Sequence, residues 1–289
     1  MGKIWDIGFD TVCDSVKLLP FLFLTYLAME YLEHYTGEKT ARAIQRAGRF
    51  GPFPGALLGL LPQCGFSAAA AGLYAGRVIT TGTLLAVFLA TSDEMLPILI
   101  SEGAPASMVA RILAVKFLFG MLFGFLVDFF HRRPVKTAGD CGAGEWERDA
   151  AAHGEMCEHG ILRPAFFHTL QVFAFLFLIT FVLNGAVAWL GEESFRGFLL
   201  ARPVVGEMLT AFFGLLPNCA ASVAVTRFYL AGAMSAGAMT AGLLSGAGVG
   251  LLVLFRVNRD RRQNGKIVGL LYVSAVAGGL LVSGLGIVF

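Results

Sequence analysis

The chain alternates long apolar runs with short polar connections. A transmembrane helix needs about 20 mostly apolar residues, and six runs reach that length, near 16–35, 80–100, 108–130, 165–190, 234–255 and 267–289. Two further apolar runs, near 51–76 and 203–231, carry a repeated pentapeptide. Apolar residues make up 56% of the chain, which exceeds the apolar share of a soluble domain, and charged residues make up 15%. This pattern predicts an all-α integral membrane protein.

The repeated pentapeptide is LLPQC at 60–64 and LLPNC at 215–219. An offset of 155 residues aligns 59–99 with 214–254 without a gap. Pro, Cys, Ser and Tyr coincide in this register, and such matches are harder to obtain by chance than matches of Ala, Gly and Leu. The sequence therefore predicts an internal duplication.

The basic residues indicate how the two halves are oriented, because Lys and Arg concentrate in cytoplasmic loops. If each pentapeptide run is a hairpin of two short helices and the N-terminus lies outside, 15 of the 22 basic residues are cytoplasmic. If each run is instead one straight crossing, this bias nearly vanishes. We therefore expect two inverted-topology repeats of about five membrane segments each, with a broken, re-entrant hairpin in each and both termini outside.

Four segments follow from this pattern. Residues 1–15 alternate apolar and acidic positions like an interfacial amphipathic helix, and they lack the features of a cleaved signal peptide. Residues 16–130 form the first transmembrane repeat, 131–163 a cytoplasmic polar linker, and 164–289 the second repeat. The five cysteines are odd in number and contain no close CxxC pair, which argues against a disulfide framework.

The prolines of the pentapeptides are expected to break their helices, because proline lacks an amide hydrogen and clashes with the preceding turn. In transporters with inverted repeats, broken helices meet near the midplane and form the substrate site. New helix N-termini would favour the thiolate form of a nearby cysteine. The predicted substrate-binding residues are Pro62, Gln63, Cys64, Ser67, Pro217, Asn218, Cys219 and Ser222, and the alternative is a simple kink with cysteine as a small apolar residue.

Three ionisable residues lie deep in predicted spans. Asp93 and Glu94 follow the first hairpin, and charges in hydrocarbon mark ion or proton pathways. Lys116 also lies deep in a span, and we expect its positive charge to neutralise Asp93 or Glu94. We expect these three to couple an ion to transport, the alternatives being a structural ion pair or a shallower position. Glu207, which opens the second hairpin, is expected at the membrane interface.

The linker carries four soft or borderline metal ligands, Cys141, His153, Cys157 and His159. Cysteine and histidine suit zinc or copper. Their spacing matches no standard zinc motif, so a solvated linker is the alternative to metal capture.

The pentapeptide runs LLPQCGFSAAAAGLYAGRVITTGTLLAVFLATSDEMLPIL and LLPNCAASVAVTRFYLAGAMSAG, joined by a Cys/His-bearing linker that leads into ILRPAFFHTL, resemble the ten-transmembrane heavy-metal exporters. Members of that family are labelled arsenic efflux proteins or manganese transporters, and the resemblance covers nearly the whole chain. It implies an exporter in a prokaryotic cytoplasmic membrane, and His168 falls on a position where the family pattern also has histidine. This linker is poorer in His and Cys than the family pattern.

We therefore expect a secondary transporter that exports a heavy-metal or metalloid ion. No nucleotide-binding motif occurs, so an ion gradient should supply the energy. The expected partners are the lipid bilayer and a small ion, with no nucleic acid, no required cofactor and room for a homo-oligomer. The chief alternative is a transporter of a small anion bound at helix N-termini. A membrane enzyme lacks a suitable base near its cysteines, and manganese would favour the oxygen ligands over the thiols.

Overall fold

The structure, a computed structural model, describes residues 50–62, 64–92, 95–130, 170, 203–216 and 220–289. Within these ranges the secondary structure is helical, with ten helices in chain order and no strand. The prediction of an all-α protein is confirmed for this part of the chain. The predicted spans near 16–35 and 165–190, the segment 1–15 and the linker 131–163 lie outside the described residues, apart from Leu170.

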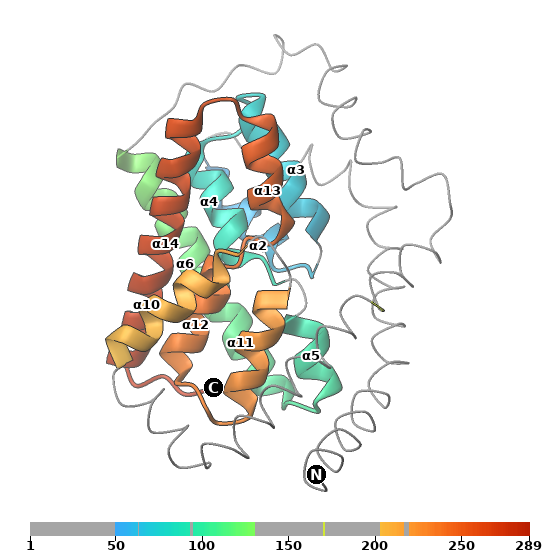
Figure 1. The fold of residues 1–289 in the computed structure, drawn as a ribbon, viewed down its shortest axis with the longest axis vertical. Coiled ribbons are helices and arrows are strands. Elements are labelled where there is room, and N and C mark those ends of the chain that lie inside the picture. Colours follow the sequence, from blue (N-terminus) through green and yellow to red (C-terminus); the bar gives the residue numbers. More distant parts are fainter. Residues whose placement is uncertain (1–49, 63, 93–94, 131–169, 171–202, 217–219) are drawn as a thin grey trace, which may run out of the picture.

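The ten helices fall into two sets of five (Figure 1). The first set is α2 (Pro52–Gly59), α3 (Cys64–Ala75), α4 (Thr81–Ala90), α5 (Met95–Ser101) and α6 (Ala106–Phe130). The second set is α10 (Pro203–Gly214), α11 (Ala220–Leu230), α12 (Ala236–Ser245), α13 (Val249–Val257) and α14 (Arg261–Gly284). Each helix of the second set follows its counterpart at close to the offset found in the sequence.

The starts of α4 and α12 show how closely the two sets correspond. The Thr80 hydroxyl accepts a hydrogen bond from the Thr83 amide at the start of α4. The Ser235 hydroxyl accepts one from the Ala238 amide at the start of α12. A hydroxyl that satisfies an amide of the first turn is a strong helix start signal. The same local chemistry therefore begins the third helix of each set.

Four helical stretches are long and apolar enough to cross a membrane: Thr81–Ser101, Ala106–Phe130, Ala236–Val257 and Arg261–Gly284. The first and third are enclosed by the protein, with 88% and 78% of their most apolar windows buried. The second and fourth are 28% and 39% buried. The stretches formed by α4 with α5 and by α12 with α13 are thus the interior of the bundle, and α6 and α14 present large apolar surfaces on its outside.

Small residues bring the helices of each set close together. A Cβ added to Gly82 of α4 would lie 2.1 Å from the Gly124 carbonyl oxygen of α6. A Cβ on Gly237 of α12 would lie 2.7 Å from the Gly279 carbonyl oxygen of α14. Small residues let membrane helices approach to backbone contact. The same glycine contact therefore joins α4 to α6 and α12 to α14.

The two sets also pack against each other. In the upper part of Figure 1, α3 of the first set lies beside α13 of the second. In the lower part, α11 of the second set lies beside α5 of the first. The main buried cluster joins α3 and α4 to α13 and α14, with Tyr74, Leu84, Leu254 and Leu271 among its members. The two sets are thus interlocked and share one core.

Candidate functional site

The first pentapeptide lies at a helix break, as predicted. Helix α2 ends at Gly59, α3 begins at Cys64, and Pro62 lies half-buried between them. Gln63 lies outside the described residues. Because Cys64 is the first residue of α3, its backbone stands at the helix N-terminus, where amide groups lack intrahelical partners.

The second pentapeptide lies at the corresponding break. Helix α10 ends at Gly214 and α11 begins at Ala220. Pro217, Asn218 and Cys219 lie outside the described residues, so the predicted meeting of Cys64 and Cys219 stays a prediction. The break itself is confirmed in both halves.

Glycines hold the two breaks against the interior helices. A Cβ on Gly59 would lie 2.7 Å from the Val87 carbonyl oxygen of α4. A Cβ on Gly214 would lie 2.2 Å from the Gly242 carbonyl oxygen of α12. Real Cβ atoms do not approach other atoms this closely, so only glycine fits at either position. The residue just before each pentapeptide is therefore in direct contact with α4 or α12.

Both interior stretches are themselves interrupted at mid-length. Helix α4 ends at Ala90, and α5 begins at Met95. Thr91 and Ser92 follow α4, and the acidic pair Asp93 and Glu94 lies outside the described residues. Helix α12 ends at Ser245, and α13 begins at Val249 after Gly248 with φ 54° and ψ −140°. Glycine adopts this backbone conformation most readily.

One predicted serine lies where two breaks meet. Ser67 of α3 is fully buried, and a Cβ on Gly250 of α13 would lie 2.7 Å from the Ser67 Cβ. The first pentapeptide break and the α12–α13 break are therefore neighbours across the two sets. Ser222, its counterpart on α11, is half-buried, and its carbonyl oxygen accepts a hydrogen bond from the Thr226 hydroxyl.

Lys116 connects the two interrupted interior stretches. Its side chain is 2% exposed, and its ammonium donates to the Thr91 carbonyl oxygen at 2.5 Å and to the Leu243 carbonyl oxygen at 2.7 Å. Thr91 caps the end of α4, and Leu243 lies in the last turn of α12. Carbonyls at helix C-termini lack intrahelical donors and carry partial negative charge. The ammonium therefore lies at the negative ends of two helices, one from each set.

Buried hydroxyls lie at the same two breaks. The Thr91 hydroxyl donates to the Val87 carbonyl oxygen, and the Ser92 hydroxyl donates to the Ala90 carbonyl oxygen. The Ser245 hydroxyl donates to the Gly242 carbonyl oxygen at the end of α12. Hydroxyls and helix-end carbonyls thus gather at the ends of α4 and α12, and such oxygen atoms are ligands suited to a cation.

Sequence reasoning missed these partners of Lys116. It assigned the lysine to Asp93 and Glu94, and that pairing stays a prediction because both carboxylates lie outside the described residues. Backbone carbonyls carry no residue signature, and the breaks after α4 and α12 that free them were not predicted from the sequence. The Lys116 position itself was found because a lysine deep in an apolar run is conspicuous.

Sequence reasoning also missed the contacts of two carboxylates, one near the end of α6 and one in the second turn of α10. Asp128 of α6 accepts hydrogen bonds from the Thr80 hydroxyl at 2.6 Å and the Gly82 amide at 2.7 Å. Glu207 of α10 is fully buried, not surface-exposed, and one of its oxygens accepts from the Ser283 hydroxyl at 2.5 Å. At the 155-residue offset Ser283 is the counterpart of Asp128, and that register was the signal in the sequence.

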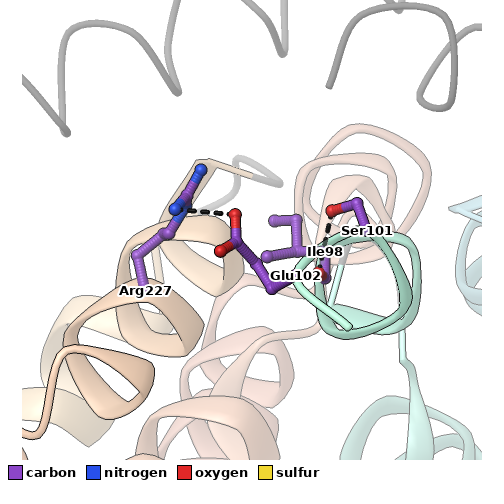
Figure 2. Close-up of polar contacts among 4 residues, drawn as sticks. All are labelled: Ile98, Ser101, Glu102 and Arg227. Atoms are coloured by element: carbon purple, nitrogen blue, oxygen red, sulfur yellow. Dashed lines mark hydrogen bonds and ion pairs between the residues drawn. The ribbon is translucent and has the colours of Figure 1, made fainter. Parts of the chain in front are cut away.

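An ion pair joins the two sets at the lower end of the bundle. Figure 2 shows Arg227, near the end of α11, pointing toward Glu102, just after α5, and their charged atoms lie 2.7 Å apart. The side chains are 17% and 27% exposed. The neighbouring Ser101 hydroxyl donates to the Ile98 carbonyl oxygen and closes the end of α5.

The four linker ligands, Cys141, His153, Cys157 and His159, lie outside the described residues, as does His168. Within the described ranges, no three His, Cys, Asp or Glu side chains come together. Metal capture by the linker therefore stays a prediction.

Comparison with known proteins gives one match. The family model described as "Putative, 10TM heavy-metal exporter" matches residues 5–183, which include α2 to α6, the first pentapeptide and the linker. This stretch is more than half of the chain. No curated protein and no solved structure matches it.

Proposed function

Since the chain belongs to the family of ten-transmembrane heavy-metal exporters, we propose that it is a secondary active transporter that exports a heavy-metal or metalloid ion. Export proceeds by alternating access around a midplane site made by the two pentapeptide breaks. The protein is a multi-pass membrane protein, and its proposed location is a prokaryotic cytoplasmic membrane.

The observation that carries this proposal is the position of Lys116. Its ammonium bonds a helix-end carbonyl from each set, at 2.5 Å and 2.7 Å. Non-helical backbone within the membrane is tolerated only where it is buried in protein or lines a polar cavity. Interrupted helices that meet near the centre are the usual substrate site of inverted-repeat transporters. The four helix breaks among the described residues therefore favour a transport site over a purely structural bundle.

The packing supports re-entrant hairpins. Helices α2 and α3 have 8 and 12 residues, so they are about 12 Å and 18 Å long at 1.5 Å per residue, whereas the hydrocarbon core is about 30 Å thick. Gly55 and Gly59 of α2 lie against Thr83 and Val87 of α4 in that order, so α2 and α4 run the same way. Helix α3 must then return the chain to the side from which α2 started.

The packing also supports an inverted relation between the sets. Met95 and Leu99 of α5 pack in one cluster with Met234 and Ala238 at the start of α12. The start of α12 therefore lies beside the end of the α4–α5 stretch, and α12 begins on the side opposite to the start of α4. A pseudo-two-fold axis in the membrane plane is the geometry that alternating access uses.

The exposed basic residues support the proposed sidedness. Arg77 precedes α4, and Arg256, Arg259 and Arg261 lie where α13 leads into α14, all of them exposed and at the same end of the bundle. Arg227 lies at the other end, with its ion pair to Glu102. The end with more Arg is proposed to be cytoplasmic, which places both termini and the Glu102–Arg227 pair outside.

In this proposal Cys64 and Cys219 bind a thiophilic ion at the breaks. The polar neighbours are Pro62, Gln63, Ser67, Pro217, Asn218 and Ser222, through side chains or freed carbonyls. Asp93 and Glu94 exchange protons or another coupling ion near Lys116. The linker residues collect the ion on the cytoplasmic side.

The test is cellular metal content by elemental mass spectrometry, with expressing cells compared with vector controls over a panel of metals and metalloids. We expect one thiophilic element to be depleted, and the Cys64→Ser/Cys219→Ser double variant to restore it to the control level. The matched control is Cys13→Ser, which removes a thiol that the proposal assigns to no metal site.

The other outcomes separate the alternatives. Depletion of manganese that survives the Cys64→Ser/Cys219→Ser change would move binding to oxygen ligands at the same breaks. No depletion of any element, with normal membrane expression, would contradict metal export. It would favour a small anion held at the N-termini of α3 and α11.

A further inference from the structure

Glu207 is a buried carboxyl that the proposed transport site does not use. It lies one turn into α10 and its side chain has no exposed surface. Its Oε1 accepts the Ser283 hydroxyl at 2.5 Å, whereas its Oε2 is buried without a hydrogen-bond partner. Most buried polar atoms have a partner, so this oxygen requires a physical reason.

No cation on the packed helices faces this carboxyl within the described residues. Helix α12, which lies against it, has no ionisable side chain. The basic residues of α14 lie at its start, near Arg261, whereas Ser283 lies at its end. The Tyr272 hydroxyl of the same helix donates to the Met208 carbonyl oxygen. On α11, Arg227 pairs with Glu102. Among the residues that the structure describes, an ionised Glu207 would therefore have no counter-charge.

The first set of helices shows the contrasting arrangement. The Asp128 carboxyl lies in the corresponding three-helix contact, half-buried, and accepts both the Thr80 hydroxyl and the Gly82 amide. Each of its oxygens has a donor, as an ionised carboxylate needs. Asp128 thus has a donor for each oxygen at the start of α4, whereas Glu207 has one donor for two oxygens.

A proton resolves this imbalance better than a metal ion does. Burying an unpaired carboxylate is costly, and a buried acid avoids that cost by binding a proton. A metal cation needs several oxygen ligands, and Glu207 presents one unpartnered oxygen. We propose that Glu207 is a proton-binding site, in which Oε2 carries the proton and Oε1 accepts from Ser283. Its use as a coupling site, loaded from the end of the bundle where α14 finishes, rests on the proposed transport function.

The direct test is infrared spectroscopy of the purified full chain in lipid, titrated from acid to alkaline pH. We expect wild-type protein to show a protonated carboxyl band that is absent in Glu207→Gln and present in Asp128→Asn. An identical band in wild type and Glu207→Gln would overturn the proposal. This readout does not depend on any transported ion.

A second variant covers the case in which Glu207→Gln fails to fold. Ser283→Ala keeps the carboxyl but removes the hydrogen bond to Oε1. We expect the band to move to higher frequency, because the protonated carboxyl loses its one hydrogen bond. An unshifted band in Ser283→Ala would contradict the assignment to Glu207.

Coupling is tested separately in proteoliposomes that contain a pH-sensitive dye, with the element identified by the metal-content experiment. We expect Glu207→Gln to lose ion-driven proton movement and to keep downhill exchange of the ion. Unaltered proton movement would remove Glu207 from coupling. If no element is transported at all, the proposed function fails, while the infrared result still stands for or against the proton site.

Discussion

A lysine at the centre of a membrane helix costs about 3 kcal/mol to insert, and Lys116 meets that cost with backbone oxygen. The carbonyls of Thr91 and Leu243 are helix ends that need donors. One ammonium thus satisfies an orphan carbonyl in each set of helices. The lysine and the helix breaks are mutually dependent features.

Replacing Lys116 by Met keeps most of the side-chain length and removes the ammonium. Each carbonyl left without a donor costs about 1–3 kcal/mol, which is partly offset by removing the buried charge. We expect a net loss of roughly 1–3 kcal/mol in stability, together with loss of export. The measurement is the thermal unfolding midpoint in detergent, followed by cellular metal content.

The matched control is Lys266→Met, which changes an exposed lysine on α14. Its unfolding midpoint and export should stay close to those of wild type. Equal behaviour of the two variants would show that the Lys116 bonds neither stabilise the bundle nor support transport.

At the scale of helices, the offset of 155 residues is a packing rule as well as a sequence pattern. Gly59 meets Val87, and Gly214 meets Gly242, at the same register. Alanine at Gly59 or Gly214 would place a methyl within 3 Å of a backbone oxygen, which no side-chain motion can relieve. We expect each substitution to lower stability by about 1–3 kcal/mol, measured as the thermal unfolding midpoint in detergent.

Gly72→Ala is the control within α3, because a Cβ there meets nothing within 4 Å. Alanine in an open helix position is neutral or stabilises by up to about 1 kcal/mol. If Gly59→Ala were as stable as Gly72→Ala, the close contact between α2 and α4 would not exist.

The sequence predicted the breaks at the two pentapeptides because proline leaves a local signature. It did not predict the breaks after α4 and α12, whose apolar runs were expected to be continuous spans. Helix α3 begins within two residues of Pro62, and all four long apolar stretches were expected. Contacts between distant elements have no such signature. Glu207 appeared interfacial because it opens an apolar run, and its burial depends on Ser283, 76 residues further along the chain. The pairing of α3 with α13 is likewise a property of tertiary packing.

On the scale of the whole molecule, the two interlocking contacts differ in kind. At one contact, Gly250 of α13 touches the Ser67 backbone and side chain. At the other, α5 and α11 are joined by the partly exposed Glu102–Arg227 pair, and exposed pairs contribute about 0–1 kcal/mol. A transporter must open one side at a time, and the second contact is the weaker one to separate.

The inverted arrangement itself makes a prediction about sidedness. Arg77 and Ala231 occupy nearly equivalent positions in the two sets, after α3 and α11, and both are exposed. Parallel sets would place them on the same face of the membrane, whereas inverted sets place them on opposite faces. Single cysteines at these two positions, in a chain whose native cysteines are replaced by serine, separate the two arrangements.

We expect a membrane-impermeant thiol reagent to label Ala231→Cys in intact cells and Arg77→Cys only after permeabilisation. Ser107→Cys, at the exposed start of α6, should be labelled with Ala231→Cys because Glu102 and Arg227 bring those two ends together. Arg259→Cys should be labelled with Arg77→Cys. Labelling of Arg77→Cys and Ala231→Cys from the same side would contradict inversion, and with it the alternating-access mechanism that depends on inversion.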